Sequence, residues 1–350
     1  MWNVQKKRSH KGKELLVSLN GAFRNYSPTY GYGVAAENIV KGLEGNEIPY
    51  EIADFGADIE IFWGHPPYDF TRYGQYKIGY TAWESTGFKT AWRETMIGAD
   101  EIWTPSTWLS EHFEKEIGVP TFTYPHGVDK DWKPYRRYYS EDNPPFRFLH
   151  VGEPQFRKNG QLVVEAFAEL FGNDPNYQLV MKSAGINTTR IYQPQSGSII
   201  GTPPLLYRNI IFIDTIMSKE QLIELHNKSH CLLYPTGGEG FGFHPLEAAA
   251  SGLPTISTTG WCDYKEFISV GIDSEMVDSP WPDLHPGQLF QPTKQQIKDA
   301  MIEMVENYDK YASEAFKNSF KVHEQWNWDV QNKKAAERLK DIYFSSFMKN

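Results

Sequence analysis

The feature that most constrains the fold is a regular alternation of short apolar runs with amphipathic windows. In the first half of this 350-residue chain, runs with strand character are separated by windows with helical periodicity. The strand candidates are ELLVSL, YEIADF, IEIFWG, KIGYTAW, EIWTPS and TFTYPHGV, and the helical windows are VAAENIVKGL, TAWRETMIGA and STWLSEHFEKEIG. This rhythm predicts βα units, and therefore an α/β fold with a parallel sheet.

A polar, aromatic segment at residues 129–146 has neither the helical period nor the alternation of a strand, and a second βα series follows it. We predict two doubly wound domains, residues 1–130 and 146–325, joined by a linker at 131–145, with ligands bound in a cleft between them. Residues 326–350 are predicted to form an amphipathic helix that packs back on the first domain. The loop between Lys182 and Asn209 is long enough to suggest a functional role.

Composition narrows the class of partner. The net charge of -9 and a pI near 5.6 argue against nucleic acid as the main partner, because phosphate neutralisation requires clustered cations. One basic cluster, at residues 5–13, is interpreted as a solvated terminus. No stretch approaches the roughly 18 apolar residues of a membrane span, and the run LLVSL is too short for a signal peptide. We therefore expect a cytoplasmic chain without integral membrane contact.

The stretch GGEGFGFHPLEAAASGLPTIS, residues 237–257, contains the most specific chemistry. Glycines precede a short helix whose N-terminus is a ready anion site, and a carboxylate stands on each side, Glu239 and Glu247. Carboxylates repel phosphate but bind hydroxyl pairs well. A nucleotide-sugar matches this arrangement, because its anionic diphosphate lies between the hydroxyls of a ribose and those of a sugar. The alternative is that Glu247 caps its helix from the third position and that Glu239 is a loop charge.

The segment from Glu239 to Glu247, followed by AAASGLP, resembles the Glu-x7-Glu motif of the family 4 retaining glycosyltransferases. HGVD at 126–129, ADEIWTPSTW from Ala99 and FLHVGEPQFRKNGQLVVEAF from Phe148 resemble further parts of that family. The resemblance is strong from about residue 99 to residue 260 and patchy before residue 90. It implies the GT-B fold, in which two Rossmann-like domains face a central cleft.

The resemblance also implies roles for residues of the second domain. Glu247 would bind the donor ribose, and Glu239 would act as a catalytic residue beside the donor sugar, with the backbone of Gly240, Phe241 and Gly242 close to the sugar and phosphate. Arg157 and Lys158 would hold the diphosphate. The family often has Arg directly after the glycine that ends the preceding strand, whereas Glu153 follows Gly152 here. The missing phosphate contact would then come from Arg157 or from Lys182.

In the first domain, Gly31 and Gly33 precede a helical window and resemble the family's glycine loop, so Gly33 is a candidate substrate-binding residue. His65 ends a strand where the family has a His that touches the donor sugar, and we assign it a catalytic role beside Glu239. Glu84 is a weaker candidate for the acceptor side. Asp129 and Asp131 have metal-like spacing but fall next to the linker, so no metal and no cofactor are expected.

The resulting prediction is retaining transfer of a sugar from a nucleotide-diphosphate sugar to a hydroxyl acceptor. One alternative keeps the chemistry and takes hydroxymethylated DNA bases as acceptors, which the basic N-terminus favours and the net charge disfavours. The other alternative is a nucleotide-sugar binding protein without turnover. The base, the sugar, the acceptor and the oligomeric state do not follow from the sequence, because specificity depends on small polar changes in loops.

Overall fold

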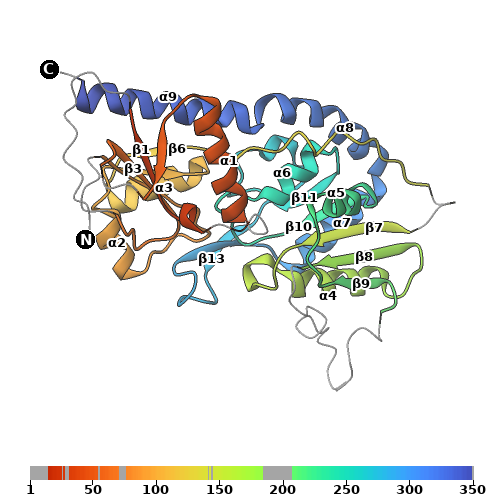
Figure 1. Cartoon of the computed structure of the whole chain (residues 1–350). Coiled ribbons are helices and arrows are strands. Elements are labelled where there is room, and N and C mark those ends of the chain that lie inside the picture. The colour runs from red at the N-terminus through yellow and green to blue at the C-terminus, as the bar shows by residue number, and fades with distance from the viewer. Residues whose placement is uncertain are drawn as a thin grey trace. The chain divides into compact units, whose positions relative to one another are not determined.

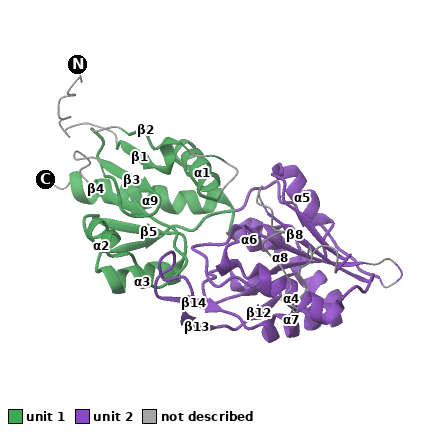
Figure 2. Cartoon of the chain, turned by 90° about the horizontal axis from the view of Figure 1, so that it is seen from below, with its two compact units in different colours: residues 1–127, 326–350 green, residues 128–325 purple. Residues whose placement is uncertain are grey.

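The computed structural model describes residues 15–25, 27, 31–53, 56–70, 76–140, 142, 145–183 and 207–348. The chain forms two compact units, coloured separately in Figure 2. The first consists of Met1–Gly127 and Trp326–Asn350, and the second of Val128–Gln325. The chain therefore passes between the units twice, and its C-terminal segment belongs to the unit in which the chain begins.

The first unit is built on a parallel six-stranded sheet with the strand order β2-β1-β3-β4-β5-β6. Its strands are β1 (Val17–Gly21), β2 (Tyr50–Ile52), β3 (Ile59–Trp63), β4 (Tyr76–Tyr80), β5 (Glu101–Thr104) and β6 (Thr121–Thr123). The N-terminal part of this unit, up to Gly127, contains the helices α1 (Gly31–Gly45), α2 (Thr90–Met96) and α3 (Thr107–Ile117), and the 3₁₀ turn η1 (Ala22–Arg24) follows β1. Strands β1 and β3 are almost wholly buried, including their polar residues Ser18, Asn20 and Glu60.

Aromatic rings fill much of this unit's core. Trp63, Tyr80, Trp103 and Tyr124 are fully buried, and their rings contact one another along the sheet. The abundant Trp and Tyr of the sequence therefore serve largely as core side chains here.

Helix α9 (Trp328–Phe347) packs beside α1 within the first unit (Figure 1). The guanidinium of Arg338 binds both oxygens of the buried carboxylate of Glu101, at 3.0 and 2.7 Å. Asn332 accepts a hydrogen bond from the Tyr124 hydroxyl and lies so close to Gly42 that a side chain on Gly42 would collide with it. These contacts attach the C-terminal helix to the first unit.

The second unit has a parallel six-stranded sheet with the order β12-β11-β10-β7-β8-β9 and a separate antiparallel hairpin, β13-β14. Its strands are β7 (Phe146–Val151), β8 (Tyr177–Lys182), β9 (Ile210–Ile213), β10 (Cys231–Tyr234), β11 (Thr255–Thr258), β12 (Val270–Ile272), β13 (Glu275–Asp278) and β14 (Gln288–Gln291). Its helices are α4 (Gly160–Phe171), α5 (Lys219–Asn227), α6 (Phe243–Ala250), α7 (Lys294–Glu306) and α8 (Tyr308–Gln325), with the 3₁₀ turns η2 (Phe156–Lys158) and η5 (Lys265–Phe267).

The strand order of the second sheet creates a topological switch point. Counted in chain order from β7, the six strands lie in the sequence 3-2-1-4-5-6 when read from the β9 edge. After β7 the chain continues toward one edge of the sheet, and after β10 it continues toward the other edge, although the two strands are neighbours. Ligands of open α/β sheets bind at such a point, outside the carboxyl ends of the strands.

The segment expected as a linker, residues 131–145, is part of the second unit. Its buried Arg137 donates hydrogen bonds to the carbonyls of Ser251 and His226, at 2.6 and 3.2 Å, and to the side chain of Asn227 at 3.1 Å. Arg137 thereby satisfies carbonyls at the C-terminal ends of α5 and α6. The aperiodic sequence of residues 131–145 gives no sign that a buried arginine anchors this segment.

Two further expectations concern chain organisation. Most of the long loop after Lys182, residues 184–206, and the basic cluster at 5–13 lie outside the described residues. None of the helices that the structure describes combines the length and the apolar character that crossing a bilayer requires.

Candidate functional site

The candidate site lies at the switch point of the second sheet and is formed by the loops after β7 and β10. The backbones of these loops are joined directly, because Gly237 N–H donates to the carbonyl of Arg157 at 2.5 Å. Asn159, whose φ is +56°, donates from its side-chain amide to the carbonyl of Pro235 at 2.7 Å. The two loops therefore hold their side chains in a fixed mutual position.

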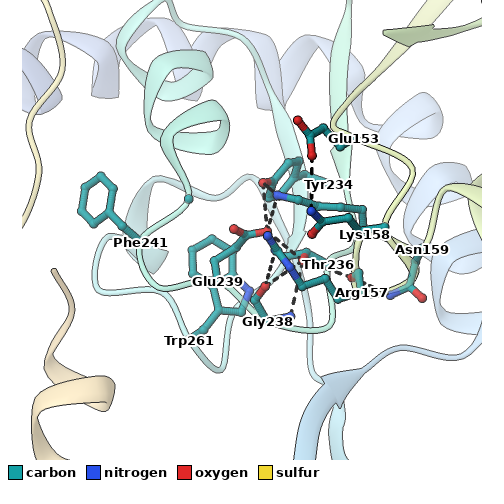
Figure 3. A network of polar contacts seen from close by, with 12 residues as sticks. Glu153, Arg157, Lys158, Asn159, Tyr234, Thr236, Gly238, Glu239, Phe241 and Trp261 are labelled. Carbon is teal, nitrogen blue, oxygen red and sulfur yellow. Dashed lines mark hydrogen bonds and ion pairs between the residues drawn. The ribbon is translucent and has the colours of Figure 1, made fainter. Parts of the chain in front are cut away.

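Four donors converge on one oxygen of Glu239 (Figure 3). Arg157 Nη1 lies 2.7 Å and Lys158 Nζ 2.5 Å from Glu239 Oε1. The hydroxyls of Tyr234 and Thr236 donate to the same atom at 3.0 and 2.9 Å. Among the described residues, every hydrogen bond and ion pair of this carboxylate is made to Oε1. The sequence predicted these three charged residues as site residues but not that they bind one another.

The electrostatics of the network follow from its burial. Arg157 and Lys158 are each 8% exposed, and Glu239 is 6% exposed. Burial alone would raise the pKa of the Glu239 carboxyl, but the charges of Arg157 and Lys158 outweigh it and lower the pKa to about 2. Burial raises the pKa of the Tyr234 hydroxyl well above its ordinary value, so this group remains a neutral donor. The two cations and the carboxylate together carry a net positive charge.

Glycines allow the close packing of these loops. Gly242 has a φ of +80°, and a Cβ there would lie 2.6 Å from the Trp261 ring. Gly242 is also the residue before the first turn of α6, and no side chain caps this helix end. The aliphatic stem of Lys158 lies over Gly152, where a Cβ would meet it at 3.5 Å.

Glu247 occupies the second turn of α6 and does not cap the helix. Its Oε2 lies 3.0 Å from His244 Nδ1, one turn earlier, and its side chain is 16% exposed. The structure therefore contradicts the capping alternative. It leaves Glu247 as a partly accessible carboxylate whose orientation is held by His244.

The other second-unit candidates make no hydrogen bond to Glu239 in the part of the chain that the structure describes. Lys182 ends β8 and donates to the backbone carbonyls of Ser183 and Thr215. Glu153 accepts a hydrogen bond from the Gln155 side chain at 3.3 Å. Gly240 lies buried in the loop before α6. The Phe241 ring, 4% exposed, packs against Tyr264 and points away from the network in Figure 3.

The first-unit candidates lie at the carboxyl ends of their own sheet. His65 follows β3; its exposed ring stacks on Trp92 at 5.7 Å and meets the edge of Tyr32 at 5.1 Å. The sequence suggested that Gly33 lies in a loop before a helix, but Gly33 lies inside the first turn of α1. A Cβ on Gly33 would lie 1.8 Å from the Ser27 carbonyl, so packing within the unit itself requires glycine at this position.

Three residues of the site escaped the sequence interpretation: Tyr234, Thr236 and His244. Tyr234 ends the apolar run CLLY, which reads as an ordinary buried strand. Its position in the sequence could have indicated its role. Tyr234 stands at the carboxyl end of a strand, directly before the motif, and ligands of such sheets bind outside the carboxyl ends of the strands.

No group of three or more His, Cys, Asp or Glu side chains arranged to hold a metal ion occurs in the part of the chain that the structure describes. Asp129 and Asp131, which have metal-like spacing, both pair with the ammonium group of Lys219 at 3.0 and 3.2 Å.

Two Rossmann-like units, each built on a parallel sheet, define a class of two-domain α/β proteins, and buried cations and a carboxylate lie at the switch point of the second sheet. Comparison with known families gives the more particular assignment. The model of the family described as glycosyl transferases group 1 matches residues 133–321, more than half of the chain, and the chain belongs to this family.

Individual relatives agree with that assignment. A segment of 110 residues is 32% identical to the serotype-specific mannosyltransferase WbdA of Escherichia coli, covering 31% of this chain and 13% of WbdA. The fold is that of Anabaena HepE in complex with UDP and glucose (TM-score 0.64, 13% identity, 94% of this chain and 100% of that chain). It is also that of sucrose-phosphate synthase from Thermosynechococcus elongatus (TM-score 0.65, 12% identity, 95% and 100%). The α/β class and the two-domain GT-B fold predicted from the sequence are thereby confirmed.

Proposed function

We propose that this chain is a retaining glycosyltransferase that moves a sugar from a nucleotide-diphosphate sugar to a hydroxyl acceptor. The observation that carries the proposal is the pair of buried cations, Arg157 and Lys158, fixed at the switch point of the second sheet. A buried site with net positive charge matches a diphosphate. Ribose and sugar hydroxyls match the carboxylates of Glu247 and Glu239.

The relatives support the same donor class. The HepE structure holds UDP and glucose, and the pneumococcal O-GlcNAc transferase GtfA, another solved structure with this fold, holds UDP and GlcNAc. WbdA is a mannosyltransferase, although its match covers only 13% of its length. The two solved complexes share UDP and differ in the sugar.

The proposed mechanism is mainly electrostatic. The diphosphate gains negative charge as the glycosidic bond breaks, and Lys158 and Arg157 stabilise that charge in a site with little water. The uncapped N-terminus of α6 adds its amides and its positive dipole end. Glu247, oriented by His244, binds the ribose, and Glu239 Oε2 meets the donor sugar. The catalytic role of His65 stays a prediction. The departing phosphate accepts the proton of the acceptor hydroxyl on the same face of the sugar, so no side-chain nucleophile is required.

A panel of nucleotide-sugars in a thermal-shift assay tests this proposal. UDP-glucose, UDP-N-acetylglucosamine and GDP-mannose should be compared with their nucleoside monophosphates as controls. A true donor at 100 times its dissociation constant stabilises the folded chain by about 2.7 kcal/mol, which raises Tm by several degrees. If no nucleotide-sugar raises Tm, the donor assignment is wrong.

Two alternatives are separated by further measurements. A DNA-base glycosyltransferase would bind duplex DNA in gel shifts with affinity that falls steeply with salt, whereas we expect no such binding. A nucleotide-sugar binding protein would bind the donor without ever releasing nucleoside diphosphate. The intact pair of carboxylates favours turnover, and the presence of Glu153 where relatives often have Arg favours binding alone.

We also predict that transfer does not depend on a divalent metal. Arg157 and Lys158 supply the positive charge that a diphosphate requires, so chelation should leave activity nearly unchanged. Release of nucleoside diphosphate should be followed in excess EDTA, with added magnesium or manganese as the comparison. Near-total loss of activity in EDTA, restored by either metal, would contradict the prediction.

A further inference from the structure

We propose that Glu239 is a built-in counter-ion of the diphosphate site, which an incoming diphosphate must displace from Arg157 and Lys158. This inference deepens the function proposed above and rests on it for the identity of the anion. It assigns the carboxylate a role in setting the affinity of the site and the release of product, in addition to any contact with the donor sugar.

The first step of the argument is geometric. One carboxylate oxygen, Glu239 Oε1, contacts both cationic head groups at 2.7 and 2.5 Å inside a buried network. These are the head groups that a diphosphate would bind. A diphosphate and Oε1 therefore compete for the same charge-assisted hydrogen bonds.

The second step concerns what holds Glu239 when the cations turn toward a ligand. Removing the partners of a buried carboxylate is costly unless other donors remain. Tyr234 and Thr236 donate two neutral hydrogen bonds to the same oxygen. Because these donors come from β10 and the turn after it, they hold Oε1 in place while Lys158 and Arg157 bind phosphate.

The third step concerns release. After sugar transfer the product is a nucleoside diphosphate, which two buried cations would retain strongly. As the product leaves, the Glu239 carboxylate forms its ion pairs with the two cations again. The empty site therefore never contains two buried positive charges without a counter-ion. Neutralising Glu239 should therefore tighten diphosphate binding and slow product release, although the carboxylate lies among the binding residues.

Inorganic pyrophosphate is the probe, because it carries the diphosphate without a base or a sugar. Its dissociation constant is measured by calorimetry in EDTA for the wild type, Glu239→Gln and Glu239→Asp. The matched control is Glu169→Gln, since Glu169 is an exposed carboxylate that also lies between two cations, Lys294 and Lys298. Far-UV circular dichroism and thermal melting establish that each variant is folded.

We expect Glu239→Gln to bind pyrophosphate about tenfold or more tightly than the wild type, since a charge-assisted hydrogen bond no longer competes. Glu239→Asp should tighten binding by a smaller factor because its shorter side chain lengthens both ion pairs. Glu169→Gln should match the wild type. Equal or weaker binding in folded Glu239→Gln overturns the inference; if that variant does not fold, equal or weaker binding in Glu239→Asp overturns it.

The outcomes distinguish this inference from the proposed function. Turnover of a nucleotide-sugar without tighter pyrophosphate binding in the Glu239 variants would leave the function standing and refute the counter-ion role. The expected order of pyrophosphate affinities, without binding of any nucleotide-sugar, would support the counter-ion role and refute the donor assignment.

Discussion

Replacing Lys158 with alanine is expected to lower the rate of sugar transfer by about 10²–10³, the usual effect of removing one preorganised donor from a developing negative charge. The ammonium group of Lys158 is buried and its stem is held over Gly152, so its charge acts on the leaving phosphate with little screening by water. The rate should be measured as nucleoside diphosphate release under saturating donor and acceptor.

Two comparisons make the Lys158 result specific. Lys294→Ala removes a partly exposed lysine of the same unit that pairs with Glu169, and it should leave the rate unchanged. Lys182→Met tests the second phosphate ligand suggested by the sequence; because Lys182 donates to backbone carbonyls, we expect a smaller loss than for Lys158→Ala. A folded Lys158→Ala variant with the full rate would refute the role of this lysine in the reaction.

Replacing Glu247 with glutamine is expected to raise the dissociation constant of the donor roughly ten- to a hundredfold, with little change in kcat. The ribose lies far from the reacting carbon, so its contact contributes equally to the ground state and the transition state. Loss of a hydrogen bond to a charged group costs about 1.5–3 kcal/mol, which corresponds to that range. Calorimetric titration with the nucleotide-sugar gives the constant directly.

The structure removes an ambiguity from the Glu247 experiment. Since this carboxylate contacts His244 and caps no backbone amide, glutamine should not weaken α6, and Tm without ligand should stay close to that of the wild type. Glu224→Gln, which changes an exposed carboxylate on α5, is the matched control. An unchanged donor constant in a folded Glu247→Gln variant would contradict the ribose assignment.

The fold could be predicted from the sequence because it depends on local signals. A parallel strand that is covered on both faces appears in the sequence as a continuous apolar run, as in β10, and the helices between the strands have a helical period. The rhythm therefore predicted two parallel sheets and a helical C-terminus. The anchoring of residues 131–145 could not be predicted, since Arg137 holds this aperiodic segment through buried hydrogen bonds that leave no pattern in the sequence.

The site could be predicted only in part. The motif identified Glu239 and Glu247, and the resemblance identified Arg157 and Lys158. Tyr234 and Thr236 were missed because a strand-ending tyrosine and a turn threonine are common, and their role depends on where their hydroxyls point. The substrate-binding role of Gly33 stays a prediction, and the structure adds that the Ser27 backbone lies where a side chain on Gly33 would go.

By itself, the sequence determined that the chain contains two βα series and which charged side chains stand at the ends of its strands. Only the tertiary structure decided that Glu239 binds Arg157 and Lys158, which precede it by 82 and 81 residues. That contact exists because β7 and β10 are neighbours in the sheet, although strands β8 and β9 and helices α4 and α5 lie between them along the chain. Strand order is set by long-range packing. Local periodicity reports only whether each residue is buried, so it does not predict which strands are neighbours.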